Sequence, residues 1–219
     1  MNKITQPNPF LILTAVLLAV FVVPSSISGT AIALPYISSH IHSDLATLQW
    51  VVNAFNLTFA SFTLIWGKLS DLFGRKKSFL LGAVIYTLAS LGSALSHNTL
   101  LLDIFRAFAG IGGAAIFACG SAIFIHQFDG QQRTKAFALF GTTAGLGITL
   151  GPTLSGILLD TIGWQSIFYL HTLALLIVLF MSRYIPADHT QSGSVKQIDI
   201  LGSILFIIPN QLEDAGLRT

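Results

Sequence analysis

The sequence predicts an all-α membrane protein built as a six-helix transmembrane bundle. Of its 219 residues, 53% are hydrophobic and only 9% are charged, and the mean hydropathy is +0.76. A soluble domain carries about 25% charged residues, so most of these side chains must face lipid or one another. The apolar runs are long and do not alternate with polar residues, which favours helices over barrel strands. Basic residues, finally, occupy every second loop between the runs.

A helix that crosses a bilayer needs about 20 predominantly apolar residues, and six segments meet this length. We predict spans at 10–37, 48–66, 78–96, 99–125, 135–159 and 165–184. Pro24 should kink or break the first span. Residues 1–9 precede this 10–184 bundle, 185–199 form a linker, and 200–219 hold the start of an incomplete seventh helix and a polar tail.

The basic residues predict the orientation of the bundle. The loops after spans one, three and five contain no Lys or Arg, whereas the other segments do. Cytoplasmic loops carry the excess of Lys and Arg, so the amino terminus and the linker are expected to be cytoplasmic, in a multi-pass protein of the cell membrane. The cations used are Lys3, Lys68, Arg75, Lys76, Lys77, Arg133, Lys135, Arg183 and Lys196.

Several function classes lack support in the sequence. A single cysteine, Cys119, excludes an intramolecular disulfide framework and a multi-cysteine metal site. The sequence has no phosphate loop, nucleophile elbow or dinucleotide fingerprint, so we expect neither an enzyme nor a cofactor. No histidine–carboxylate cluster has metal-ligand spacing, and a net charge of +2 does not suggest nucleic-acid binding.

The connection at 67–77 contains one acid among four cations, and two glycines expected to allow tight turns. It resembles the cytoplasmic signature between helices two and three of the major facilitator superfamily, matching at Gly67, Leu69, Asp71, Gly74, Arg75 and Lys76. The resemblance implies a conformational latch that holds the cytoplasmic side shut. The alternative is a solvated loop whose charges only set the topology.

Residues 102–113 resemble the fourth-helix motif of the same family, which carries an intramembrane arginine, here Arg106. A charge at the bilayer centre costs about 2.5–3.5 kcal/mol on insertion scales and usually faces a cavity or a partner. The resemblance implies that Arg106 lines the transport pathway and couples protonation to conformational change. Alternatively, it pairs with Asp103 at i−3 or extends toward the interface. Asp103 is the one deeply placed acid proposed as a proton carrier.

Residues 147–156 resemble the fifth-helix motif of antiporters. Gly147, Gly151 and Ser155 are four residues apart and so form one stripe, with Pro152 and Gly156 beside it. Small residues let helices approach closely in lipid. The stripe is either a simple packing seam or a gasket that opens and closes during alternating access.

Ala-Leu-Pro at 33–35 and Trp-Val-Val at 50–52 resemble the drug–proton antiporter branch with fourteen helices. That branch commonly has an acidic residue before its Ala-Leu-Pro, and Ser26 stands at the corresponding place here. At 165–166, Gln-Ser replaces the frequent Arg-Trp.

The resemblance implies the amino-terminal half of a transporter, made of 3+3 inverted repeats, with substrate bound near mid-membrane between spans one, two, four and five. Its partners would be a small-molecule substrate, protons and the lipid bilayer. The missing carboxy-terminal half predicts either a truncated product or two copies that dimerise. The rival hypotheses are a transport-incompetent membrane protein and a six-helix channel or interaction protein that acts as an oligomer.

Overall fold

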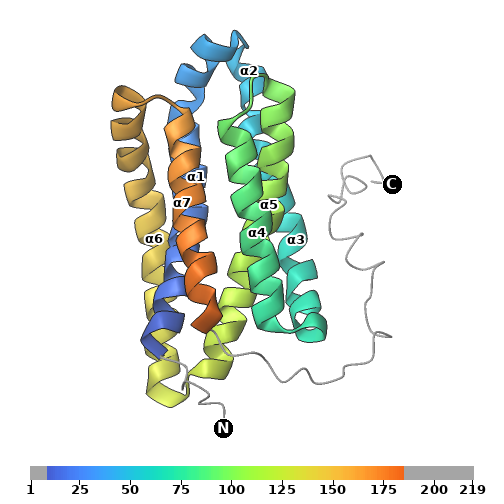
Figure 1. Cartoon of the computed structure of the whole chain (residues 1–219), viewed down its shortest axis with the longest axis vertical. Coiled ribbons are helices and arrows are strands. Elements are labelled where there is room, and N and C mark those ends of the chain that lie inside the picture. Colours follow the sequence, from blue (N-terminus) through green and yellow to red (C-terminus); the bar gives the residue numbers. More distant parts are fainter. Residues whose placement is uncertain (1–8, 185–219) are drawn as a thin grey trace, which may run out of the picture.

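The computed structural model describes residues 9–184, and this part of the chain is a bundle of helices without strands. The elements are α1 (Pro9–Ile41), α2 (Leu45–Leu48), α3 (Trp50–Phe73), α4 (Arg75–Ala94), α5 (Thr99–Gln127), α6 (Gly130–Thr161), α7 (Gln165–Met181) and the 3₁₀ turn η1 (Ser182–Tyr184). The helices run roughly along one axis, and short α2 lies at one end (Figure 1).

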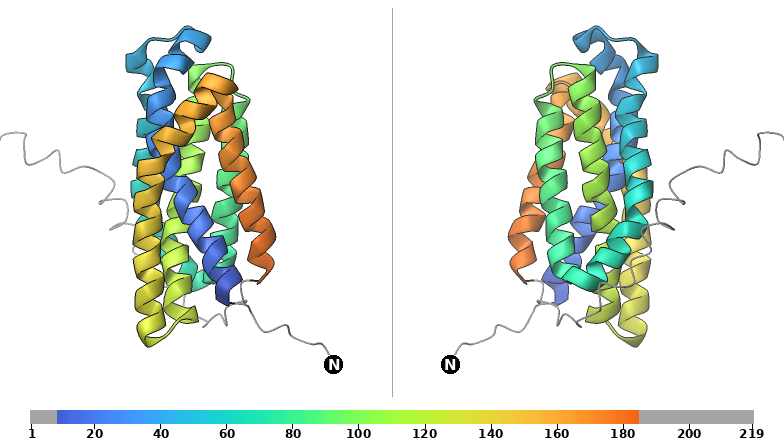
Figure 2. Two further views of the ribbon diagram at one scale, coloured as in Figure 1. Left: turned by 90° about the vertical axis from the view of Figure 1, so that its left-hand side faces the viewer. Right: turned by 90° about the vertical axis from the view of Figure 1, so that its right-hand side faces the viewer.

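The packing partners follow the symmetry expected of two three-helix repeats. Helix α1 packs on α6, and α3 packs on α5. The first repeat consists of α1, α3 and α4, and the second repeat consists of α5, α6 and α7, in that order. When each helix is replaced by its counterpart in the other repeat, the α1–α6 contact becomes the α5–α3 contact. The same exchange converts the α4–α5 contact into the α1–α7 contact, which is also present. Figure 2 shows α6 alongside α1 in one view and α4 alongside α5 in the other.

Glycine allows a close contact between α4 and α5. A methyl group on Gly112 would lie 2.6 Å from the carbonyl oxygen of Gly82 and 2.7 Å from the backbone nitrogen of Tyr86. Hydroxyl groups reinforce the neighbouring contacts, as where Thr58 of α3 donates to the carbonyl of Ala107 at 2.8 Å. Close backbone approach and interhelical hydrogen bonds are how helices associate in lipid.

The helix ends are set by local chemistry. The side chain of Asn98 accepts a hydrogen bond from the backbone N–H of Leu101 and caps α5. Asp44 caps α2 in the same way through Thr47. Gly74 separates α3 from α4 with φ 92°, a backbone conformation that residues with a Cβ rarely adopt. These polar and glycine positions coincide with three of the predicted loops.

The predicted spans are confirmed as helices, with several corrections to their limits. Helix α3 continues to Phe73, because nothing before Gly74 interrupts it. The structure adds α2, which the apolar pattern does not indicate, and α7 ends at Met181. Helix α1 is continuous, so Pro24 does not break it. Five helical segments are long and apolar enough to cross a membrane, and α7 is a shorter apolar helix.

The two ends of the bundle differ in charge. The α3–α4 and α5–α6 connections, the start of α1 and the end of α7 lie at one end (Figure 1). Every Lys and Arg of residues 9–184 except Arg106 belongs to a segment at or near that end. The connections that hold Asp44, Asn98 and Gly163 lie at the opposite end. The predicted linker at 185–199 and the start of a seventh helix lie outside the described residues.

Candidate functional site

Arg106 of α5 is the most deeply buried charged side chain of the bundle. Its exposed fraction is 1%. The guanidinium Nε donates to the carbonyl oxygen of Val51 on α3 at 3.1 Å, and Nη1 donates to the Ser26 hydroxyl on α1 at 2.9 Å. A single side chain therefore joins three helices that the sequence separates by 80 and 55 residues.

Aromatic rings surround the same guanidinium. Its central carbon lies 4.4 Å from the centre of the Phe55 ring and 5.8 Å from that of Phe168 on α7. Aromatic faces attract a desolvated cation. Tyr86 of α4 and His171 of α7 are buried nearby and interact with Arg106 electrostatically. Five helices thus contribute to the surroundings of Arg106.

The hydrogen bonding of this cluster is incomplete. Nη2 of Arg106 and the hydroxyl of Tyr86 are both buried, and neither has a hydrogen-bond partner of normal geometry among residues 9–184. Nδ1 of His171 is also buried and has no hydrogen-bond partner among these residues. Because buried polar groups are normally paired, these unpaired groups mark the surroundings of Arg106 as the candidate site.

The predicted pairing of Arg106 with Asp103 is wrong for this conformation. Among residues 9–184, Asp71 pairs with Arg75 and Asp129 pairs with Arg133, whereas Asp103 and Arg106 do not form an ion pair. Asp103 is partly buried, and its Oδ1 has no hydrogen-bond partner within the described bundle. The outward-extended alternative for Arg106 is also wrong, since its nitrogens bond to Val51 and Ser26 inside the bundle.

The predicted stripe on α6 is confirmed as a buried contact with α1. Gly147, Gly151 and Ser155 are buried, whereas Pro152 and Gly156 are partly exposed. A methyl group on Gly151 would lie 2.7 Å from the carbonyl oxygen of Ser25, while one on Gly156 would meet nothing within 4 Å. The first three residues therefore form the seam, and Gly156 has no packing role in it.

The signature segment at 67–77 is more helical than predicted. Gly67 lies inside α3, so its predicted role in a turn is wrong, and Gly74 alone makes the connection. Nη2 of Arg75 lies 3.3 Å from Oδ1 of Asp71. The Asp71 side chain is 69% exposed, so this pair contributes at most about 1 kcal/mol. It joins consecutive helices at the basic end of the bundle, and Lys76 follows in the first turn of α4.

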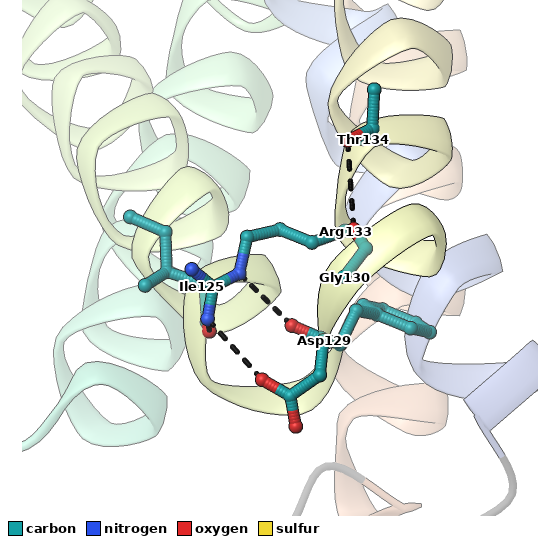
Figure 3. A network of polar contacts seen from close by, with 6 residues as sticks. Ile125, Asp129, Gly130, Arg133 and Thr134 are labelled. Carbon is teal, nitrogen blue, oxygen red and sulfur yellow. Dashed lines mark hydrogen bonds and ion pairs between the residues drawn. The ribbon is translucent and has the colours of Figure 1, made fainter.

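Arg133 has a structural role that the sequence analysis missed by assigning it to topology alone. It reaches back from α6 and donates to the carbonyl oxygens of Ile125 at 2.7 Å and Phe128 at 3.0 Å. Figure 3 shows Arg133 lying over the loop between Ile125 and Asp129. Nη2 also lies 3.4 Å from Oδ1 of Asp129. The arginine thus closes the end of α5, and the Asp-Gly-x-x-Arg spacing at 129–133 was the available signal.

The site offers no place for a metal ion among residues 9–184, where no group of three His, Cys, Asp or Glu side chains lies together. What the described part contains is a buried cation on α5, a small-residue seam between α1 and α6, and charged turns at one end.

Known proteins similar to this chain are membrane transporters. Uncharacterized MFS-type transporter YvkA of Bacillus subtilis is 36% identical over 195 residues, which are 89% of this chain and 44% of the relative. Multidrug resistance protein Stp of Mycobacterium tuberculosis is 32% identical over 179 residues, 81% of this chain and 33% of the relative. Riboflavin transporter RibZ of Clostridioides difficile is 30% identical over 200 residues, 90% of this chain and 43% of the relative.

The chain thus spans less than half the length of these curated relatives. Residues 16–208 match the Major Facilitator Superfamily. This range includes α1 from its second turn and every later helix of the described bundle. This match, together with the six-helix arrangement and its repeat-related contacts, shows that the chain belongs to the Major Facilitator Superfamily of multi-pass membrane transporters.

Proposed function

We propose that this chain is the amino-terminal half of a transporter that exports drugs or other small amphipathic molecules in exchange for protons. The burial of Arg106 between α1, α3 and α5 is the observation that carries the proposal. An intramembrane charge held by hydrogen bonds to other helices is typical of substrate and proton pathways. Two of the similar proteins, multidrug resistance protein Stp and riboflavin transporter RibZ, are named for organic molecules, which supports an organic substrate.

Arg106 can sense movement between helices because its two hydrogen bonds cross helix boundaries. A shift of α1 or α3 against α5 breaks the bond to Ser26 or to Val51, so the charge must find other partners. Asp103 lies one turn away on α5 and is the proton carrier in this proposal. Its partly buried carboxylate has an unpaired oxygen that can take up a proton.

The α1–α6 seam and the Asp71–Arg75 pair would serve the conformational change. Gly147, Gly151 and Ser155 let α6 slide along α1 at close distance, as a gasket requires. Asp71 and Arg75 would latch the basic end, which we place in the cytoplasm because Lys and Arg gather there. Substrate would then bind between this half and a partner, either a carboxy-terminal half or a second copy.

The test is transport in lipid vesicles with an imposed pH gradient, measured for the purified chain alone and for the chain reconstituted with the carboxy-terminal half of a full-length relative. We expect efflux of an amphipathic dye that depends on the gradient. Arg106→Ala and Asp103→Asn should abolish this coupling while the protein still inserts and keeps its helix content. Gradient-driven transport that survives Arg106→Ala would overturn the role of Arg106.

The same vesicles separate the rival functions. A voltage-driven ion current with no dye movement would identify a channel. The absence of both signals from a folded, inserted protein, with and without the added carboxy-terminal half, would identify a transport-incompetent protein. Asp71→Asn with unchanged transport would reduce the 67–77 segment to a topological role.

A further inference from the structure

Among residues 9–184, the positive charge of Arg106 has no negatively charged partner. The side chain is 1% exposed, and its hydrogen bonds go to a backbone carbonyl and a hydroxyl, both neutral. Asp71 and Asp129 pair with Arg75 and Arg133 instead. Removing a guanidinium from water without a counter-charge costs several kcal/mol, which neutral acceptors and an aromatic ring only partly offset.

The groups that remain unpaired around this charge are mainly donors. Among residues 9–184, neither Nη2 of Arg106 nor the Tyr86 hydroxyl has a hydrogen-bond partner of normal geometry, although the two groups lie close enough to interact with each other. The Ser26 hydroxyl already receives one bond from Nη1 and interacts with Tyr86. A guanidinium with a phenol and an alcohol next to it matches the needs of an anion, which accepts hydrogen bonds and carries the missing charge.

We propose that Ser26, Tyr86 and Arg106 form a binding site for a small monovalent anionic group, either the carboxylate of a transported compound or a free halide. The carboxylate alternative rests on the proposed transport function, whereas binding itself does not. Nη2 of Arg106 and the Tyr86 hydroxyl donate to the bound group, and its single charge neutralises the arginine. Entry requires α1, α3 and α5 to separate, because the cluster is closed to solvent in the conformation shown.

Ser26 is the residue that keeps this site positive. Its hydroxyl oxygen lies 2.9 Å from Nη1 of Arg106, so a carboxylate at position 26 would neutralise the guanidinium from within the chain. Ser26→Asp adds that charge, and Ser26→Asn is a control of nearly the same shape without it. The two variants separate the effect of charge from the effect of side-chain size.

The binding test is thermal unfolding of the purified chain, followed by tryptophan fluorescence. The protein is titrated with sodium chloride or sodium benzoate, and sodium sulfate keeps the ionic strength constant. We expect a saturable rise in the unfolding temperature for the original chain and for Ser26→Asn. Ser26→Asp should start from a higher unfolding temperature than Ser26→Asn and lose more than about tenfold in apparent anion affinity, because its own carboxylate competes.

Equal anion responses in the three proteins would overturn the proposal. A Ser26→Asp protein that is no more stable than Ser26→Asn would overturn it as well, since Arg106 would then have no uncompensated charge. If Ser26→Asp does not fold, Tyr86→Phe decides. It retains the ring, loses the donor and should weaken anion binding, and an unchanged affinity would contradict the site.

The two sources of the anion are separated by the response and by transport. A stronger response to benzoate than to chloride assigns the site to a carboxylate compound, and a response to chloride alone assigns it to a halide. Uptake of radiolabelled benzoate but not benzamide into vesicles, lost in Ser26→Asp, supports a transported carboxylate. Binding without any transport would leave the site standing and refute the transport function, whereas benzoate transport unaffected by Ser26→Asp would refute the site.

Discussion

Helices α4 and α7 differ from α3 and α6 in what they show on the outside of the bundle. In residues 78–94 of α4 every exposed residue is aliphatic, and in α7 every exposed residue is apolar or aromatic. Helix α3 instead exposes Asn53 and Asn56, and α6 exposes Thr142, Thr149 and Thr153. The repeat symmetry that relates α4 to α7 also relates α3 to α6, so the difference occurs twice.

Average hydropathy does not reveal this difference. The most apolar stretches of α4, α6 and the Leu45–Phe73 segment all have a hydropathy of 1.3. Yet 56% of that stretch is buried in α4, against 22% in α6 and 17% in the segment containing α3. Helices α4 and α7 thus present hydrocarbon, as contact with lipid requires, while α3 and α6 leave polar groups uncovered that suit water or further protein.

The largest effect should come from placing a charge on each surface. Leu88 of α4 is 62% exposed, and Leu88→Lys should destabilise the inserted protein by about 2.5–3.5 kcal/mol. Thr149→Lys, on the polar stripe of α6, should cost clearly less, because water or a polar partner can solvate the ammonium there. Unfolding by denaturant in lipid micelles measures both. Equal losses would show that the two surfaces meet the same solvent.

A smaller effect should distinguish the two faces of α6 itself. Gly151→Ala pushes a methyl group to 2.7 Å from the Ser25 carbonyl oxygen of α1 and should destabilise the bundle by about 1–3 kcal/mol. Gly156→Ala is the matched control. It meets nothing within 4 Å and should be neutral or stabilise α6 by up to about 1 kcal/mol. If both variants behave alike in thermal unfolding, the seam is not set by close backbone contact.

A substitution at Arg133 tests how α6, which buries little of its surface, is held to α5. Arg133→Lys keeps the charge but cannot reproduce both bonds to the carbonyls of Ile125 and Phe128. We expect a loss of about 1 kcal/mol, since the arginine is partly exposed and water can replace these bonds. The same change at Arg75, which bonds to an exposed carboxylate, serves as a comparison and should cost less in thermal unfolding.

The smallest effect concerns the turn before α3. Hydrogen bonds from the Thr47 hydroxyl and backbone N–H hold the pKa of Asp44 below its ordinary value of 3.8. A lowered pKa means that the cap stabilises α2 above pH 3.8 and that this contribution is lost as the pH falls through the lower, folded-state value. Thr47→Val should raise the pKa of Asp44 toward 3.8, measured by carboxyl NMR. An unchanged pKa would show that the hydroxyl plays no part.

Arg106 shows where sequence reasoning reached its limit. Its place inside a span was predictable, but the partner proposed for it was Asp103, because spacing on one helix is all that a sequence displays directly. The actual partners are Ser26 and Val51, which lie on other helices. Gly67 and Gly74 show the same limit of sequence reasoning within one segment. Both are glycines beside charged residues, and only the path of α3 decides that the turn occurs at Gly74.

The sequence by itself determined the six main apolar helices, their order, the basic and non-basic ends of the bundle, and the small-residue stripe on α6. These follow from hydrophobic length, from loop charge and from a repeat of four residues, all of which are local along the chain. Only the tertiary structure decided that the α6 stripe faces α1, that Arg106 lacks a carboxylate, and that α3 and α6 leave polar groups uncovered. These features depend on which helices pack together. Helices of equal hydropathy differ in how much of their surface is buried only because their neighbours differ.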